Sequence, residues 1–159
     1  MTGNCHAPFL GGLGMATSPG YPIIKGTMSN QPIKTSVGIL SGRDAIYLDE
    51  IDPVYDKRTI VFVGEINASL ASEYRGNAKW LKYKIKFFGV DALRMTELDC
   101  YESEINLASS FDRVMVPTMK SRTMECKQFI LATYDHIFEI MATDYEFEII
   151  DERNAEQQH

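Results

Sequence analysis

Apolar and charged residues alternate strictly along residues 80–90, WLKYKIKFFGV. The odd positions from 81 to 87 are apolar, and the three even positions between them are lysines. A period of two places the apolar set on one face of a β-strand and the lysines on the other. Because strands of a parallel sheet are covered on both faces and read as unbroken apolar runs, this segment predicts a half-buried strand of an antiparallel sheet.

Short runs rich in β-branched or aromatic residues predict eight strands in all. They span residues 37–40, 45–51, 59–66, 79–88, 90–98, 127–134, 137–142 and 145–150. Asp52-Pro53 predicts the end of the second strand, because proline cannot donate a hydrogen bond to a central ladder. Residues 67–75 have one weak apolar stripe and predict at most one or two helical turns. The expected fold is mainly β, an antiparallel β-sandwich or flattened barrel with at most one short helix.

The phase of the alternation changes near Thr143. Apolar residues occupy even positions from 138 to 142 and odd positions from 145 to 149. A slip of one residue requires a β-bulge or a turn, since it would otherwise move every side chain to the opposite face. Residues 97–111 have a mixed pattern, and the polar residues 118–127 predict an exposed loop.

The composition changes near residue 37 and predicts three parts of the chain. Residues 1–36 hold six of the eleven glycines and four of the six prolines but only two charged residues, so they predict an arm without regular elements. Apolar residues such as Phe9 and Tyr21 lead us to expect part of this arm to lie against the body or a neighbouring molecule. Residues 37–150 form the β-rich domain, and the polar residues 151–159 form a tail.

Charge and cysteine content narrow the classes of function. The 159 residues suit one domain, and the net charge of -6 with a sequence pI near 5.1 argues against nucleic-acid binding and anionic membrane surfaces. A basic partner or a neutral ligand fits better. The three cysteines include no CxxC pair, so no disulfide framework, metal site or cofactor site is predicted. Without an apolar stretch of about 20 residues or a secretory signal, the expected location is the cytoplasm.

Tyr134-Asp135-His136 is the strongest local group of chemically active residues. Asp135 and His136 could act as a general base, and a nearby Cys100 or Cys126 would complete a nucleophilic site. The alternative is a hairpin turn, because the pair lies between two apolar strands and aspartate favours turns. We favour the turn.

Acidic residues are concentrated in two segments. Residues 135–156 contain eight acids and one arginine, and residues 91–112 contain six acids and one arginine. A structural explanation pairs Glu146 and Glu148 with the lysines at 82, 84 and 86 across a strand pair, with roughly 0.2 to 1 kcal/mol from each pair. A functional explanation is an acidic surface that steers a basic partner, and the two explanations are compatible.

Three segments carry a resemblance to known proteins. KIKFFGV at 84–90, SSFDRV at 109–114 and YDHIFEI at 134–140 resemble small β-rich bacterial proteins of uncharacterised function. Some members of that group are thought to act as immunity proteins against polymorphic toxins. The resemblance implies a β-rich fold and protein binding, and it implies no catalytic residue.

The leading hypothesis is a non-enzymatic protein-binding module, an inhibitor of the immunity type that presents an acidic face to a basic partner. The predicted face contains acids, two aromatic anchors and a histidine: Glu97, Asp99, Tyr101, Glu102, Glu104, Tyr134, Asp135, His136 and Glu139. One alternative is a small-molecule or hydrolytic site that uses Asp135, His136 and one cysteine. Another is a structural subunit that forms a homo-oligomer when its N-terminal arm adds to a neighbour's sheet edge.

Overall fold

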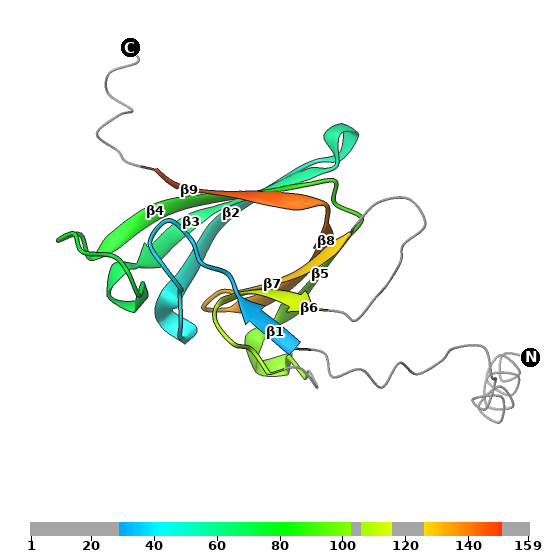
Figure 1. Ribbon diagram of the computed structural model, residues 1–159. Coiled ribbons are helices and arrows are strands. Elements are labelled where there is room, and N and C mark those ends of the chain that lie inside the picture. Colours follow the sequence, from blue (N-terminus) through cyan, green and yellow to red (C-terminus); the bar gives the residue numbers. More distant parts are fainter. Residues whose placement is uncertain (1–28, 103–105, 116–125, 151–159) are drawn as a thin grey trace, which may run out of the picture.

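Two antiparallel β-sheets face each other in the part of the chain that the computed structural model describes, residues 29–102, 106–115 and 126–150 (Figure 1). The five-stranded sheet has the order β1 (Ser29–Pro32), β6 (Phe111–Met115), β7 (Lys127–Ala132), β8 (His136–Ala142) and β5 (Ala92–Glu97). The four-stranded sheet has the order β2 (Ile46–Val54), β3 (Thr59–Asn67), β4 (Trp80–Phe88) and β9 (Asp144–Ile150). The mainly β fold is confirmed, and over these residues the two sheets stay open instead of closing into a barrel.

The helical segments of the described residues are single 3-10 turns. They are η3 (Arg43–Ala45), η4 (Tyr55–Lys57), η5 (Ala68–Leu70) and η6 (Leu98–Cys100). The helix expected within residues 67–75 is the turn η5, in which the Asn67 side chain accepts a hydrogen bond from the Ser69 N–H. No helix in the described ranges has the length and apolar character needed to span a membrane.

The core fills the space between the two sheets. Tyr83, Ile85 and Phe87, the apolar positions predicted for β4, are fully buried, as the alternation requires. Aromatic rings join the sheets, because Phe62 of β3 meets Phe138 of β8 edge-on at 5.1 Å between centroids. Each such side chain contributes roughly 1.5 to 3 kcal/mol by leaving water.

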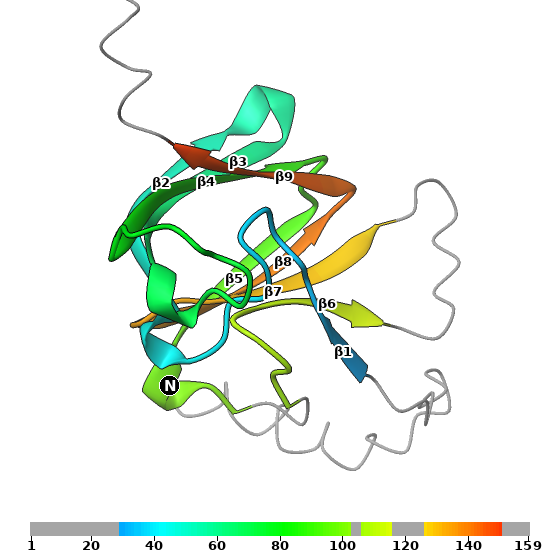
Figure 2. The ribbon, with the colours of Figure 1, turned by 60° about the vertical axis from the view of Figure 1, so that its left-hand side comes forward.

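The chain passes between the sheets at two adjacent corners, Gly89 and Thr143. Gly89 joins β4 to β5 and Thr143 joins β8 to β9, and Figure 2 shows both links between the layers. The Thr143 N–H donates to the Phe88 carbonyl at 2.9 Å. Gly89 has a φ of +58°, and a Cβ there would lie 2.3 Å from the Thr143 hydroxyl, so the corner requires glycine. The predicted phase slip near Thr143 is therefore a turn between sheets.

The outer face of the four-stranded sheet carries the predicted charge ladder. Lys84 lies opposite Glu148 and Lys86 opposite Glu146 on β9, while Lys82 lies opposite Glu65 on β3. The register confirms the cross-strand pairing of lysines with acids. Part of the acid concentration near the C-terminus is thus structural.

Two strand predictions were wrong. Residues 37–40 form no strand and make isolated bridges, Thr35 with Gly38 and Leu40 with Ala71. Asp52-Pro53 does not end β2, which continues to Val54 with Pro53 opposite Ile60. Because β2 is the edge of its sheet, it tolerates a residue without an N–H.

Two strands were missed. The mixed segment 97–111 ends where β6 begins, and β1 lies inside the predicted arm. Residues 29–36 belong to the sandwich because Ile33 is buried and its N–H donates to the Phe111 carbonyl at 2.8 Å. Residues 1–28 of the arm, the tail 151–159 and most of the predicted loop 118–127 lie outside the described residues.

Candidate protein-binding face

The hairpin turn between β7 and β8 holds the central residues of the predicted face. The Thr133 N–H donates to the His136 carbonyl at 2.8 Å, and the Thr133 hydroxyl accepts the His136 N–H at 3.1 Å. Tyr134 and Asp135 are exposed at the tip. The predicted hairpin turn is confirmed, with Asp135 in the turn and His136 as the first residue of β8.

An aromatic row runs from this turn onto the four-stranded sheet. The Tyr134 N–H donates to the Ile46 carbonyl at 2.8 Å, which fixes the turn beside the start of β2. The Tyr134 ring stacks on Tyr47 with centroids 5.0 Å apart, and Trp80 meets Tyr47 edge-on at 5.3 Å. We call Tyr134, Tyr47 and Trp80 the aromatic row; Tyr134 and Trp80 are more than a third exposed.

Cations lie at both ends of the aromatic row. The Arg43 guanidinium is 5.3 Å from the Tyr134 centroid, and its Nη1 is 3.3 Å from Asp99 Oδ1. At the other end, Lys79 Nζ is 5.9 Å from the Trp80 centroid. The faces of these rings therefore already attract cationic groups, and each exposed contact of this kind contributes about 0.5 to 1 kcal/mol.

Carboxylates surround the row. The Tyr47 hydroxyl donates to Asp44 Oδ1 at 3.5 Å; desolvation first, and then the Asp44 carboxylate, raises the pKa of Tyr47. Glu97 lies opposite His136 at the end of β5, and the Leu98 N–H donates to the Asp135 carbonyl at 2.8 Å. Strand pairing thus brings the exposed acids Glu97 and Asp135 together, with Asp99 in the following turn.

A hollow of about 310 Å³ opens beside Arg43. Its wall includes Leu98, Leu107 and Ala132, with Thr133 of the hairpin turn at its edge. An apolar hollow next to exposed charges provides room for one anchoring side chain of a partner.

Two predicted residues lie away from the aromatic row. Tyr101 packs against a small apolar cluster formed by Val114, Ile130 and Ile137 on the outer face of the five-stranded sheet. Glu139 lies opposite Arg94, with Oε2 3.5 Å from Nη1, and its side chain is 21% exposed. Tyr101 therefore covers the outer face of the sheet, and Glu139 is part of strand β8.

Glu102 and Glu104 complete the predicted acids. Glu102 is exposed next to Tyr101, and Glu104 lies outside the described residues.

The geometry does not assemble the alternative hydrolytic site among the described residues. Cys100 Sγ lies 4.0 Å from Glu97 Oε2, and Cys126 Sγ lies 3.4 Å from Asp91 Oδ2, so the two thiols are near opposite ends of β5. Over the described ranges, no hydrogen bond joins the His136 imidazole to Asp135 or to a thiol, and no group of three metal-binding side chains forms. Burial, and then the Asp91 carboxylate, raises the pKa of Cys126, which disfavours the thiolate.

No protein family, curated protein or solved structure matched the chain in the comparisons made. Sequence reasoning found Tyr134 but missed Arg43, Tyr47 and Trp80. The sequence did contain one signal for Trp80. It lies at an even position, like the lysines of its strand, so it is expected on the solvent-exposed face. Nothing in the sequence indicated that Tyr47 would stack on Tyr134.

Proposed function

We propose that this chain is a non-enzymatic protein-binding module that offers the aromatic row and its neighbouring acids to a basic partner. The observation that carries the proposal is the stacking of Tyr134 on Tyr47 at the surface, with Asp44, Asp99 and Asp135 around it. Tyrosine and tryptophan dominate binding energy at protein interfaces because they bury a large area at a small cost in side-chain entropy.

The surface chemistry favours cationic side chains over other contacts. Arg43 lies over Tyr134 and pairs with Asp99, so this small area has the ring face and the carboxylate that hold a cation, and an arginine or lysine of a partner would take the place of Arg43 there. The chain's net charge of -6 adds long-range attraction for a basic protein and raises its association rate. An inhibitor of the immunity type would work in this way, since blocking a basic enzyme requires shape and opposite charge.

The test is capture from a lysate of the source organism with matched variants of the full chain. Glu97→Gln/Asp135→Asn and Tyr134→Ala alter the face. Glu50→Gln/Asp52→Asn makes the same change of charge on exposed residues of β2. We expect a basic protein to bind the wild type and the β2 variant, to be lost from the other two, and to be released as salt rises.

Circular dichroism of each variant separates lost binding from lost folding. A purified partner should then bind with an affinity at least about tenfold lower for Tyr134→Ala, as the loss of an aromatic anchor predicts. Equal capture by all four proteins, or a captured protein indifferent to salt, would refute the proposal.

A further inference from the structure

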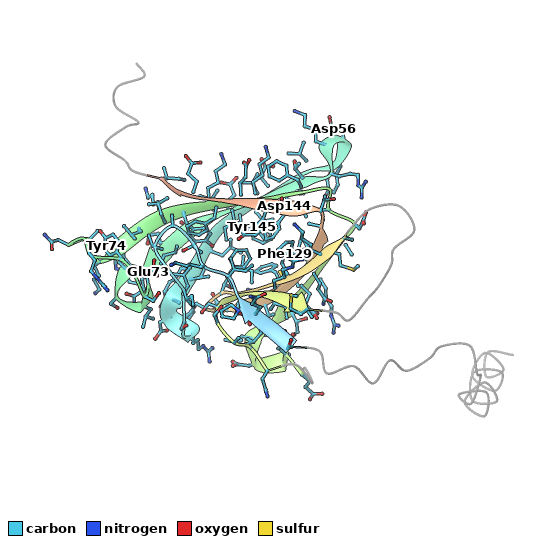
Figure 3. All side chains as sticks on the ribbon, in the orientation of Figure 1. Asp56, Glu73, Tyr74, Phe129, Asp144 and Tyr145 are labelled. Atoms are coloured by element: carbon cyan, nitrogen blue, oxygen red, sulfur yellow. The ribbon has the colours of Figure 1, made fainter. Side chains whose placement is uncertain are left out.

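A second hollow, of about 260 Å³, opens at the other end of β7 between the two sheets. Residues of β1, β6, β7 and β9 line it, among them Arg113, Lys127, Phe129 and Tyr145. Figure 3 shows Phe129 and Tyr145 between the sheets, approaching from opposite layers. Their ring centroids are 5.3 Å apart, so an aromatic floor lies beneath the mouth of the hollow.

Arg113 occupies a core-facing position in β6. It lies opposite Phe129 on β7 and Gln31 on β1, and it shares its face of the strand with the buried Phe111. Over the ranges that the structure describes, the Arg113 guanidinium forms no ion pair and donates no hydrogen bond. The Arg113 side chain is half-buried on the inner face of the sandwich, where an anionic partner would offset the hydration that the guanidinium loses.

The other cations at this hollow are already paired. Lys127 Nζ lies 3.4 Å from Asp144 Oδ1, and Lys34 Nζ lies 2.7 Å from Glu73 Oε1. Among the described residues, three cations and one carboxylate line the hollow, which makes it a positive site on a chain of net charge -6. Desolvation, and then Asp144, raises the pKa of Tyr145, whereas Arg113 lowers it, so the phenol stays a neutral donor near the guanidinium.

We propose that this hollow binds a small organic carboxylate with a flat apolar body. The carboxylate meets the Arg113 guanidinium, which presents two parallel N–H donors to it, and the Tyr145 hydroxyl is the next donor along. The apolar body lies on the rings of Phe129 and Tyr145. A hollow of about 260 Å³ is close to the lower limit of roughly 300 Å³ for ligand clefts, so the ligand is small.

The aromatic floor and the single unpaired cation favour a carboxylate over a phosphate. A phosphate group carries up to two charges and recruits several cations, whereas Lys34 and Lys127 are engaged by Glu73 and Asp144. A carboxylate needs one guanidinium, and its ring or chain gains from leaving water.

The test is titration of the full chain with sodium benzoate at constant ionic strength, followed by amide chemical shifts. We expect saturable shifts in β6, β7 and β9, and at least about tenfold weaker binding by Arg113→Met, because a charge-assisted contact is lost. Arg75→Met removes the same charge from an exposed residue in the loop before β4 and should bind benzoate within about twofold of the wild type.

Neutral and inorganic probes test the ligand class. Benzamide keeps the ring without the charge and should produce no saturable shifts, and acetate and inorganic phosphate should bind more weakly than benzoate. Binding of benzoate that Arg113→Met leaves unchanged would overturn the proposal. Equal affinity for inorganic phosphate would overturn the carboxylate class, and an intact fold of Arg113→Met, checked by its spectrum, excludes loss by unfolding.

Discussion

The outer faces of the two sheets are covered by different kinds of side chain. On the four-stranded sheet, lysines of β4 lie in register with glutamates of β9, so charged side chains cover the face and remain in water. On the five-stranded sheet, Val114, Ile130 and Ile137 form an apolar cluster that Leu98 and Tyr101 cover. The alternation of residues within each strand is enough to cover the first face. The second face is covered only when residues from another part of the chain, Leu98 and Tyr101, pack over it.

Asp112 fixes the short segment that leads into β6, at residues 108 and 109, against the same sheet. It lies on the outer face opposite Ile130 and is fully buried. Its carboxylate accepts hydrogen bonds from the Ser109 hydroxyl at 2.5 Å, the Ala108 N–H at 2.7 Å and the Asn30 amide at 3.3 Å. The same segment forms part of the 310 Å³ hollow beside Arg43, so this carboxylate also supports the proposed binding face.

An acidic residue type therefore does not by itself indicate function. Asp112 is structural because three donors satisfy it away from water, while Asp135 is exposed at a turn. Sequence charge counts treat the two alike. Substitutions at four places test this comparison between the sheets.

The largest effect is expected at Asp112. Asp112→Ala leaves three donors without their acceptor and should lower the free energy of unfolding by about 3 kcal/mol. Asp52→Ala, an exposed acid on the outer face of β2, is the matched control and should change it by less than about 0.5 kcal/mol. Urea unfolding of both variants measures the change in the free energy of unfolding. Similar changes for the two would contradict the structural role of Asp112.

The second largest effect is expected at Gly89, in the corner between the two sheets. Gly89→Ala forces a side chain into positive φ and against Thr143, so it should cost about 2 kcal/mol in thermal or urea unfolding. Thr143→Ala in the same chain removes the hydroxyl contact but leaves the backbone strain, and we expect it to recover part of the loss. A Gly89→Ala chain as stable as the wild type would show that the corner relaxes freely.

Tyr83 tests the buried face of the four-stranded sheet. Its hydroxyl is buried and, among the described residues, has no hydrogen-bond partner, so Tyr83→Phe should raise the free energy of unfolding by about 1 kcal/mol at neutral pH. Tyr55→Phe, at a tyrosine that is 86% exposed, is the control and should have no effect.

The pH dependence of Tyr83 has a definite sign. Burial first, and then Asp49, raises the pKa of Tyr83 in the folded state above its ordinary value of 10.0. Below pH 10 the phenol is neutral in both states, and above it the unfolded chain ionises first, so the wild type loses stability as pH rises. Unfolding between pH 8 and 11 should show a shallower loss for Tyr83→Phe, and identical slopes would contradict the assignment.

The fold was predictable where the pattern was local. The alternation from 81 to 87 defined β4 and its buried face, and the phase slip located the corner at Thr143. β6 was missed because Asp112 breaks the apolar pattern, and its burial depends on Ser109 and Ala108. The aromatic row could be predicted only in part. The sequence places Trp80 at an even position, on the exposed face of its strand, but its contact with Tyr47 depends on the pairing of β2, β3 and β4.

The smallest effect is expected in the charge ladder, at the pair Lys84 and Glu148. Across β3, Lys84 lies opposite the uncharged Val63, so the pair with Glu148 is separable from its neighbours. Lys84→Glu and Glu148→Lys should each cost about 0.5 kcal/mol in urea unfolding at low salt, because like charges then face each other. The double variant should return to within about 0.3 kcal/mol of the wild type, and all differences should shrink in high salt. If the double variant instead lost the sum of the two single losses in the free energy of unfolding, the charge pair would contribute nothing. The lysines would then stabilise the sheet through the apolar stems that cover it, and the two outer faces would both be covered by apolar groups.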